Sequence, residues 1–505
     1  MSHYISNLQD NPLMVQLSEI PVMDYRDFAV EVGRLMDYDE AHCVNYFAFP
    51  FNGGLKFICI VANDTDHNLH ILTHEQHPEG LNLHSLTTHH PAFHIFEREI
   101  CENSGVHFEG HKWLKPVRYP HNRSRKDFVM DNYPFYSISG EELHEVGVGP
   151  VHAGVIEPGH FRFICNGEKV LHLEIQLGYQ HRGIEAMMLD AGSGLKHSVI
   201  AESITGDTAI GHSIAFVSVI ESLAGIRVPD KLQIERAIAL ELERIAMHIG
   251  DMAALCGDVA YQLGQVVYES LRTTIINTTQ SWCGNRFGKG LIRIGGTNYP
   301  MEKEFIMAMM QTLDSSMKRF IEMSDRIFSM PSVLSRFDGI GVVTPEQART
   351  IGTVGMAARS CGIIRDIRIS HAPGAYKLIS FDSATVDSGD ILARATLRRM
   401  EVEKSAELIR MFIELHELTN DENKKPVYNP MLTPNSLSVS LTEGWRGEIC
   451  HSAITDENGN LVHYKIKDPS MHNWLALALA VRDQEISDFP VCNKSFNLSY
   501  CGHDL

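Results

Sequence analysis

The chain of 505 residues contains no long apolar run, and this absence limits where the protein can reside. A transmembrane helix needs about 18 or more consecutive apolar residues, and we find no such stretch. The N-terminus, Met1-Ser2-His3-Tyr4, also lacks the charged and apolar pattern of a signal peptide. We therefore expect a cytoplasmic protein with no direct membrane span, which reaches a membrane only through partner proteins.

Positive charge and closely spaced cysteines are scarce as well. Lys+Arg number 44 against 63 Asp+Glu, a net charge of −19, which argues against nucleic acid or an anionic lipid surface as a direct partner. None of the 10 cysteines forms a C-x-x-C pair, whereas metal sites usually need tighter ligand spacing. We expect reduced, buried cysteines, no metal ligands and no iron–sulfur cluster in this chain.

The residues that are present predict an α+β protein that starts with a small α/β domain over residues 1–120. Residues 45–49 and 56–61 are typical of strands, and the Gly-Gly pair in 51–54 predicts a hairpin between them. Residues 121–145 contain few apolar side chains and predict a linker. The second domain then covers residues 146–505.

The second domain is predicted to be mainly helical, with a small β-hairpin region. Alternating residues over 161–177 predict a hairpin that turns at Asn166-Gly167. Residues 231–282 lack proline and repeat apolar residues at helical spacing, which predicts one or two long core helices. Glu241, Glu243 and Arg244 are expected on their polar face. Residues 302–330, rich in methionine, and 389–415, rich in opposite charges, predict further helices.

Residues 177–213 hold the densest set of reactive side chains. The segment His181-Arg182-Gly183-Ile184-Glu185 places His181 and Glu185 one helical turn apart. A second segment runs from Glu202 to Ser213 and is rich in small and hydroxyl residues just before an apolar helix. Backbone N–H groups at such a position have no partner within the helix.

These segments carry a resemblance to a known family. The pair HRGIE and E-x-x-x-G-x-x-x-x-x-H-S resembles the large subunit of group 4 nickel–iron hydrogenases, the energy-converting, formate-hydrogenlyase-like branch, and the related 49-kilodalton subunit of complex I. Glu97-Arg98-Glu99 and the G-x-x-F-x-G-H of residues 105–111 resemble the 30-kilodalton subunit of complex I. Later matches follow in order, among them Arg446-Gly447-Glu448 and Asp468-Pro469-Ser470. The resemblance implies a domain like this smaller complex I subunit, fused ahead of a hydrogenase-large-subunit-like domain.

The resemblance does not extend to nickel. In the hydrogenases four cysteines hold the metal, and the matching positions here are Thr205, Thr208, Ser499 and Gly502. Threonine and serine hydroxyls ionise far above pH 7 and cannot replace soft thiolate ligands. We therefore do not expect a nickel–iron centre.

The complex I branch uses the same place as a quinone site, and this makes quinone a candidate ligand. His152 matches the family's quinone-binding histidine, but the matching tyrosine position falls on Gly206. Tyr179 and Tyr500 lie nearby in the aligned segments as substitutes. The quinone site is thus half present in the sequence.

Eleven residues are predicted to line a polar cleft. The predicted catalytic set is His181, Arg182, Glu185, Glu202 and Asp207. The predicted substrate-binding set is His152, Thr205, Thr208, His212, Asp468 and Ser499.

Each assignment has a structural alternative. His181, Arg182 and Glu185 form either a proton relay or a hydrogen-bonded turn-and-helix network. Thr205 and Thr208 would in the second case cap the following helix, and Asp207 would be a charge at its N-terminus.

The resemblance implies the catalytic-position subunit of a membrane-associated, complex-I-like oxidoreductase. Its implied partners are an iron–sulfur small subunit with a [4Fe–4S] cluster, a ferredoxin-like subunit and membrane ion-translocating subunits. Through these partners the chain would be peripheral on the cytoplasmic face of the inner membrane. Redox or protonation events in the cleft would be coupled to ion movement. The alternative is a non-catalytic scaffold that joins soluble partners to the membrane subunits.

Overall fold

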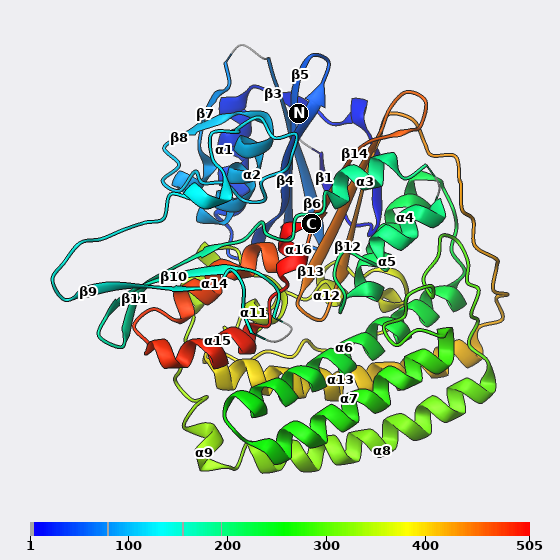
Figure 1. Cartoon of the computed structure of the whole chain (residues 1–505). Helices are drawn as coiled ribbons and strands as arrows, with labels where there is room; N and C mark the ends of the chain where they lie inside the picture. The colour runs from blue at the N-terminus through cyan, green and yellow to red at the C-terminus, as the bar shows by residue number, and fades with distance from the viewer. Residues whose placement is uncertain (1–4, 78–79, 154–155, 193) are drawn as a thin grey trace.

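The N-terminal domain is built on a sheet with strand order β1-β6-β5-β4, in which β3 also pairs with β6 (Figure 1). The structure is a computed structural model that describes residues 5–77, 80–153, 156–192 and 194–505. β4 and β5 form the predicted hairpin, with Phe51 opposite Gly54. The strands are β1 (Ile5–Leu8), β3 (Val22–Met23), β4 (Ala41–Phe51), β5 (Gly54–Asn63) and β6 (Asn68–Gln76).

Two helices, α1 (Tyr25–Met36) and α2 (His94–Ser104), pack on this sheet through an aromatic core. Asp24 caps α1 by accepting a hydrogen bond from Arg26 N at 2.9 Å. α2 ends at Gly105, whose φ of +80° suits a residue without Cβ. The short strands β7 (Asn82–His84) and β8 (His107–Glu109) pair in parallel.

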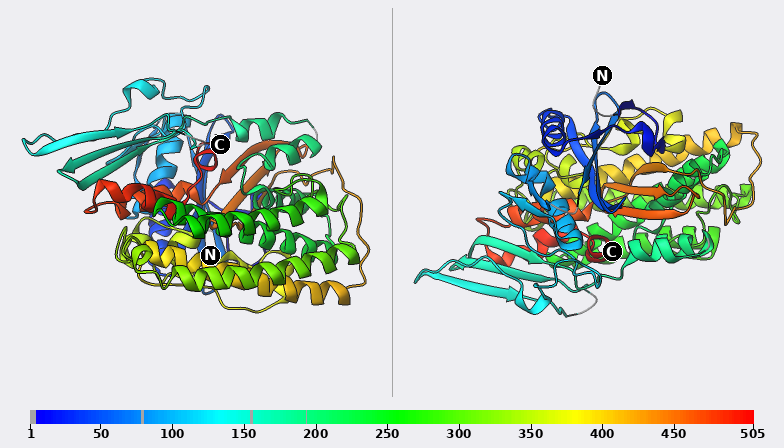
Figure 2. Two further views of the ribbon diagram at one scale, coloured as in Figure 1. Left: turned by 60° about the horizontal axis from the view of Figure 1, so that its bottom comes forward. Right: turned by 90° about the horizontal axis from the view of Figure 1, so that it is seen from above.

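A three-stranded sheet with order β11-β10-β9 projects from the body of the molecule (Figures 1 and 2). It consists of β9 (Leu143–Val148), β10 (His160–Asn166) and β11 (Lys169–Gln176). The hairpin of β10 and β11 is confirmed, but β9 begins inside the predicted linker. Its apolar side chains are few and only half-buried, so the composition of 121–145 gave a weak strand signal.

Four long helices form the layer at the bottom of Figure 1. They are α6 (Asp230–Asp258), α7 (Gln262–Cys283), α8 (Lys303–Ile327) and α13 (Ile391–Leu418). The expectation that Glu241, Glu243 and Arg244 lie on a solvated face is wrong, because all three are buried. α6 is enclosed by α5, α7, α13 and α15, and its charges pair with groups from distant segments that a periodicity argument does not detect.

The remaining helices are mostly short and lie between the long ones and the sheets. They are α3 (Ile184–Asp190), α4 (Gly194–Ala201), α5 (Ala209–Leu223), α9 (Pro331–Leu334), α10 (Pro345–Thr350), α11 (Gly355–Arg359), α12 (Ile367–Ser370), α14 (Ser470–Ala480), α15 (Phe489–Phe496) and α16 (Tyr500–Asp504). The 3₁₀ turns are η1 (Leu17–Glu19), η2 (Leu86–Thr88), η3 (Pro91–Phe93), η4 (Met130–Asn132), η5 (Gly374–Leu378) and η6 (Ile486–Asp488). Within the described ranges, no helix is both long enough and apolar enough to span a bilayer.

A fourth sheet joins the two halves of the chain. Its order is β14-β13-β12-β2, with β2 (Leu13–Gln16), β12 (Ser436–Glu443), β13 (Glu448–Thr455) and β14 (Leu461–Lys467). β2 comes from the N-terminal segment and pairs with β12. Residues 13–16 therefore belong by hydrogen bonding to the second module, although the predicted boundary at residue 120 places them in the first.

A buried charge cluster reinforces this junction. His42 on β4 lies between Asp64, with Nδ1 to Oδ2 at 3.2 Å, and Glu448 on β13, with Nε2 to Oε2 at 2.7 Å. Lys467 also contacts Glu448. Burial opposes a charged imidazole, but the carboxylates of Asp64 and Glu448 outweigh it and raise the pKa of His42.

Replacing His42 by Gln tests this junction. Because the folded pKa of His42 lies above its ordinary value of about 6.5, its contribution to stability is complete below about pH 6.5 and is lost as the pH rises through the folded pKa. We expect the free energy of unfolding of the variant to be lower by about 1–3 kcal/mol at about pH 6. This difference should shrink as the pH rises. Thermal unfolding of the purified protein across this pH range, with the exposed His84→Gln as control, measures the difference; an equal loss at every pH would contradict a charged His42.

Candidate active site

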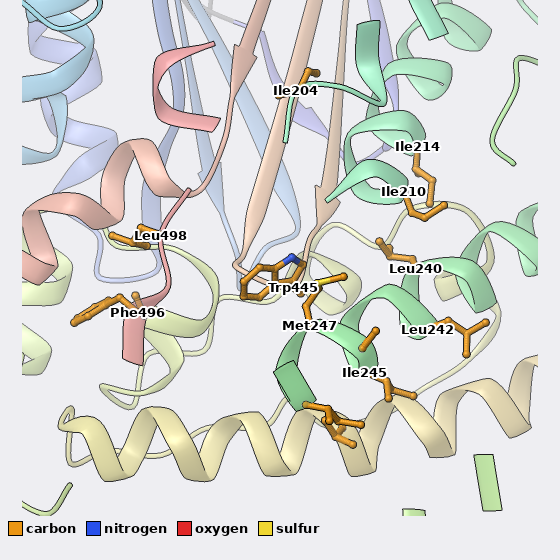
Figure 3. Packing of buried hydrophobic residues seen from close by; sticks show 14 of the residues in the cluster. Ile204, Ile210, Ile214, Leu240, Leu242, Ile245, Met247, Trp445, Phe496 and Leu498 are labelled. Carbon is orange, nitrogen blue, oxygen red and sulfur yellow. The ribbon is translucent and has the colours of Figure 1, made fainter. Parts of the chain in front are cut away.

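The turn between β12 and β13 carries two side chains to the centre of the second module. Trp445 packs in the core beside Met247 of α6 (Figure 3). At Gly447 the backbone approaches α11 so closely that a Cβ on Gly355 would lie 2.0 Å from Gly447 Cα. Two glycines are therefore required where the turn meets α11.

Arg446 follows Trp445 and forms a bidentate ion pair with Asp207, just before α5. Nη1 and Nη2 donate to Oδ1 and Oδ2 at 2.8 and 2.7 Å. The guanidinium stacks 3.9 Å from the Trp445 ring centroid, and Nε donates to Asn497 O at 2.5 Å. Burial disfavours the charge, but Asp207 outweighs it and raises the pKa of Arg446, so the guanidinium stays protonated.

A cavity of about 550 Å³ opens beside this pair. Its walls come from the β9–β11 sheet, α15 and the C-terminal segment, and they are largely apolar, with Phe161, Phe163, Phe489 and Leu498 among them. The polar and charged side chains that reach it are His152, Glu157, Asp207, Asp258, Arg446, Asn493, Lys494, Asn497 and Tyr500. A cavity of this volume, with apolar walls and polar side chains, can hold a small molecule.

At this cavity His152 is half-buried and Tyr500 is buried. His152 Nε2 lies 2.8 Å from Gly159 O, which assigns the proton to Nε2 in the neutral ring. His152 Nδ1 then has no hydrogen-bond partner among the described residues and is an acceptor, or a donor once the ring is protonated. Burial raises the pKa of the Tyr500 hydroxyl to about 12, so it remains a donor at neutral pH.

Behind Arg446 a row of four buried side chains is joined by hydrogen bonds. Asp468 Oδ2 lies 3.1 Å from His212 Nε2, His212 Nδ1 lies 3.1 Å from His451 Nε2, and His451 Nδ1 lies 2.8 Å from the Tyr464 hydroxyl. Burial opposes ionisation of Asp468, but His212 and Arg446 outweigh it and lower its pKa. Burial and the nearby His212 lower the pKa of His451 well below its usual range.

The direction of each hydrogen bond in this row follows from ionised Asp468 at one end, which can only accept. Ionised Asp468 accepts from His212 Nε2–H, so a neutral His212 must accept at Nδ1 from His451 Nε2–H, and His451 Nδ1 then accepts from Tyr464 O–H. The His212–His451 and His451–Tyr464 hydrogen bonds keep their geometry in either direction, so the row is compatible with proton transfer along it.

The positions matched to the four nickel cysteines meet in space but leave no room for a metal cluster. A Cβ on Gly502 would lie 2.7 Å from Asp468 Cγ and 2.8 Å from Thr205 Cγ2. Ser499 Oγ caps α16 by accepting from Gly502 N at 2.8 Å. These side chains supply no thiolate and are already packed together, so the residues present do not fit a nickel–iron centre.

The predicted helix caps at α5 are wrong. Thr208 is the N-cap residue without a capping hydrogen bond, because its hydroxyl interacts with Trp445 and Asp207 instead. Thr205 Oγ1 is buried with no hydrogen-bond partner among the described residues. The cap comes from Glu243, which accepts from Ile210 N and Gly211 N at 2.8 and 3.1 Å. Burial is the main reason that the pKa of Glu243 rises to about 8.

Four of the five predicted catalytic side chains are engaged outside the cavity lining. His181 Nδ1 lies 2.7 Å from Asp504 O, and Arg182 donates to Ser203 O and Ile204 O at 2.6 and 2.7 Å. The other two predicted catalytic residues, Glu185 and Glu202, are acids with basic partners. Glu185 accepts from Lys465 at 3.0 Å, and Glu202 accepts from Arg293 at 2.5 Å.

These contacts match the turn-and-helix alternative and place only Asp207 of the catalytic set at the cavity. Of the predicted substrate-binding set, His152 lines the cavity, while Thr205, Thr208, His212, Asp468 and Ser499 lie buried. Arg446, His451 and Tyr464 were not predicted as site residues from the sequence. Only Arg446 stood in a recognised motif, and the two others had no sequence signal.

Comparison with known families agrees with this architecture. The family model described as respiratory-chain NADH dehydrogenase, 49 Kd subunit, matches residues 262–504. The model for the 30 Kd subunit of the same enzyme matches residues 10–134. The expected order, with the domain of the smaller subunit type ahead of the domain of the larger type, is confirmed.

Similar proteins include hydrogenase subunits. Formate hydrogenlyase subunit 5 of Escherichia coli is 26% identical over 73% of this chain, and the match spans 64% of that relative's length. Hydrogenase-4 component G of the same organism is 24% identical over 91% of this chain and 80% of its own. A chain of the membrane-bound sulfane sulfur reductase, an archaeal respiratory membrane complex, shares the fold with a TM-score of 0.66 at 18% identity, covering 73% of this chain and 100% of that one. Residues 262–504 therefore belong to the family of the complex I 49-kilodalton subunit, and residues 10–134, ahead of them, belong to the family of the 30-kilodalton subunit.

Proposed function

We propose that this chain is the large subunit of a membrane-associated, complex-I-like oxidoreductase and that its cavity binds the electron acceptor. Electrons would come from the [4Fe–4S] cluster of a partner iron–sulfur small subunit. A ferredoxin-like subunit and membrane ion-translocating subunits would complete the complex on the cytoplasmic face of the inner membrane. Support comes from the relatives, which are subunits of hydrogenases and of a respiratory membrane complex.

The cavity beside Asp207 and Arg446 is the observation that carries this proposal. A quinone head group is a flat apolar ring with two carbonyl oxygens, and it needs apolar walls with hydrogen-bond donors at its edges. The cavity has aromatic and aliphatic walls, with Arg446, His152, Lys494 and Tyr500 as candidate donors and Glu157, Asp207 and Asp258 as acidic side chains. A quinone is therefore the acceptor class that this site fits best.

The donors suit the charge changes of quinone reduction. Four of the five N–H groups of Arg446 have acceptors among the described residues, and one Nη2–H remains for a substrate oxygen. A quinone takes up two electrons and two protons to become a hydroquinone. The positive guanidinium stabilises negative charge on the oxygen before protonation, and protonated His152 is a donor for one of the protons.

The buried row from Asp468 to Tyr464 offers a second proton store next to this site. Asp468 is close enough to Arg446 to raise the pKa of the guanidinium. Protonation of the row and reduction in the cavity would thus be linked electrostatically. In the assembled complex, this linkage would pass on to the ion-translocating subunits.

A non-catalytic scaffold is the second candidate, and one observation favours it. His181, Arg182, Glu185 and Glu202 all hold neighbouring segments together rather than face the cavity. Under this hypothesis the retained polar residues keep the fold that links soluble and membrane partners. The two candidates differ in whether the Asp207–Arg446 pair matters for electron transfer.

Replacing Asp207 by Asn tests the proposal in the native complex. The amide cannot hold the guanidinium in the bidentate geometry, so Arg446 loses its orientation toward a substrate oxygen. We expect quinone-dependent reoxidation of the chemically reduced [4Fe–4S] cluster, followed by its EPR signal, to slow at least about tenfold, since a charged hydrogen bond is worth about 1.5–3 kcal/mol.

Asp314→Asn is the matched control, because Asp314 also pairs with an arginine, Arg410, at 2.7 Å but is exposed on α8. This variant should leave the rate unchanged. If the Asp207→Asn complex assembles and reoxidises at the wild-type rate, the scaffold hypothesis replaces the redox hypothesis.

Replacing Tyr464 by Phe tests the buried row. The change removes one hydroxyl and leaves His451 Nδ1 without its donor, while the cavity lining stays intact. We expect the quinone concentration for half-maximal rate to stay constant, while the maximal reoxidation rate falls several-fold and its solvent deuterium effect grows. Tyr268→Phe removes another buried hydroxyl, bonded to Ser324 at 2.8 Å, and serves as control; identical behaviour of the two variants would remove the row from the mechanism.

A further inference from the structure

A fully buried cluster of charged side chains lies beneath the β12–β13 turn. It contains three arginines, Arg244, Arg359 and Arg368, and four acids, Glu241, Asp366, Glu401 and Glu443. Each of these seven residues is at most 1% exposed. Arg244 also donates to the backbone oxygens of Glu443 and Gly444 at 2.6 and 3.0 Å, which holds the turn that presents Arg446.

The charges in this cluster do not balance if every group is ionised. Three guanidinium groups against four carboxylates leave one negative charge uncompensated in the core, which is costly. The neighbouring His248 does not supply the missing positive charge, because burial and Arg398 lower its pKa well below the usual range. One of the four acids is therefore expected to hold a proton.

The contacts identify Glu443 as that acid. Asp366 binds Arg368 in a bidentate pair at 2.9 and 2.6 Å, and Glu401 contacts Arg359 and lies 3.0 Å from Arg368. Glu241 is bonded to Arg244 at 3.1 Å and to Ser405 at 2.5 Å. Glu443 has only Arg359 Nη2 at 3.4 Å and Ile367 N at 3.2 Å as partners among the described residues.

The electrostatic surroundings agree with this choice. Burial and the negative charge of Asp366 raise the pKa of Glu443 to about 8, against the opposing effect of Arg359, Arg244 and Arg368. The pKa values of Asp366 and Glu401 move the other way, because their arginine contacts outweigh burial. Glu443 is thus the carboxyl of the cluster that changes protonation near neutral pH.

We propose that Glu443 is a proton-storing residue, which takes up a proton when the [4Fe–4S] cluster of the partner subunit is reduced and releases it when that cluster is oxidised. The redox half of this statement rests on the proposed function. One electron enters the [4Fe–4S] cluster of the partner subunit, and one proton moves from the medium to the Glu443 carboxylate. No net charge is therefore added. The β12–β13 turn links Glu443 to the cavity, because Arg446 at the cavity lies three residues after Glu443.

Redox-difference infrared spectroscopy on the native complex tests this proposal. The complex is reduced with dithionite and reoxidised with ferricyanide, so that no quinone is needed and failure of the quinone proposal does not obscure the result. We expect the C=O stretch of a protonated carboxyl group to gain intensity on reduction at about pH 8, where Glu443 is partly ionised. At about pH 6 the group is already protonated and the difference band should vanish.

Two substitutions assign the band. Glu443→Gln mimics the protonated acid and should remove the band while the complex assembles with an unchanged melting temperature at about pH 6. Glu407→Gln, at an exposed position on α13, should leave the band in place. Glu401→Gln removes an acid that contacts all three arginines and should lower the melting temperature by several degrees.

The outcomes are distinct. A wild-type complex without a protonated carboxyl band at about pH 6, or a Glu443→Gln variant as unstable as Glu401→Gln, would show that Glu443 is ionised and would overturn the proposal. A band that is present in the absolute spectrum but constant through the redox cycle at about pH 8 would overturn its role as a redox-linked store.

Discussion

The ion pairs around Arg244, Arg359 and Arg368 are the constraint on which the site depends. They lie where α6, α11, α12 and α13 meet β12, and Arg244 binds the backbone of the β12–β13 turn directly. Burying so much charge is costly unless every group has a partner, so the cluster tolerates few alternative arrangements. The turn is therefore held in one geometry, and with it the position of Arg446 relative to Asp207.

The packing near this ion pair is tight. Thr205, Gly502 and Asp468 lie in direct contact, and a Cβ on Gly502 would clash with both neighbours. Beside them the cavity between the β9–β11 sheet and α15 is lined by apolar side chains and by the ion pair. Under the proposed function this cavity would take a neutral, flat acceptor, and the His212 row and Glu443 would hold the protons that compensate the added negative charge.

Local features of the fold were predictable from the sequence, whereas long-range pairings were not. The hairpins at 51–54 and 166–167 follow from turn residues between alternating strands, and the long helices follow from apolar periodicity. β2 could not be placed, because its partner β12 lies near the other end of the chain. The same limit applies to the site: Asp207 and His212 stood in recognised motifs, but their partners Arg446 and His451 come from other segments. Burial of Glu241 and Arg244 was missed for the same reason, since charges on a helix are expected to be solvated until their partners are known.

A cryo-EM map of the native complex with a short-chain quinone tests the central claim most directly. The account predicts density for the ring in the cavity beside Phe161 and Phe489, with one carbonyl oxygen within hydrogen-bonding distance of Arg446 or His152. An occupied quinone site elsewhere in the complex, with this cavity empty or filled by a partner's side chains, would contradict it.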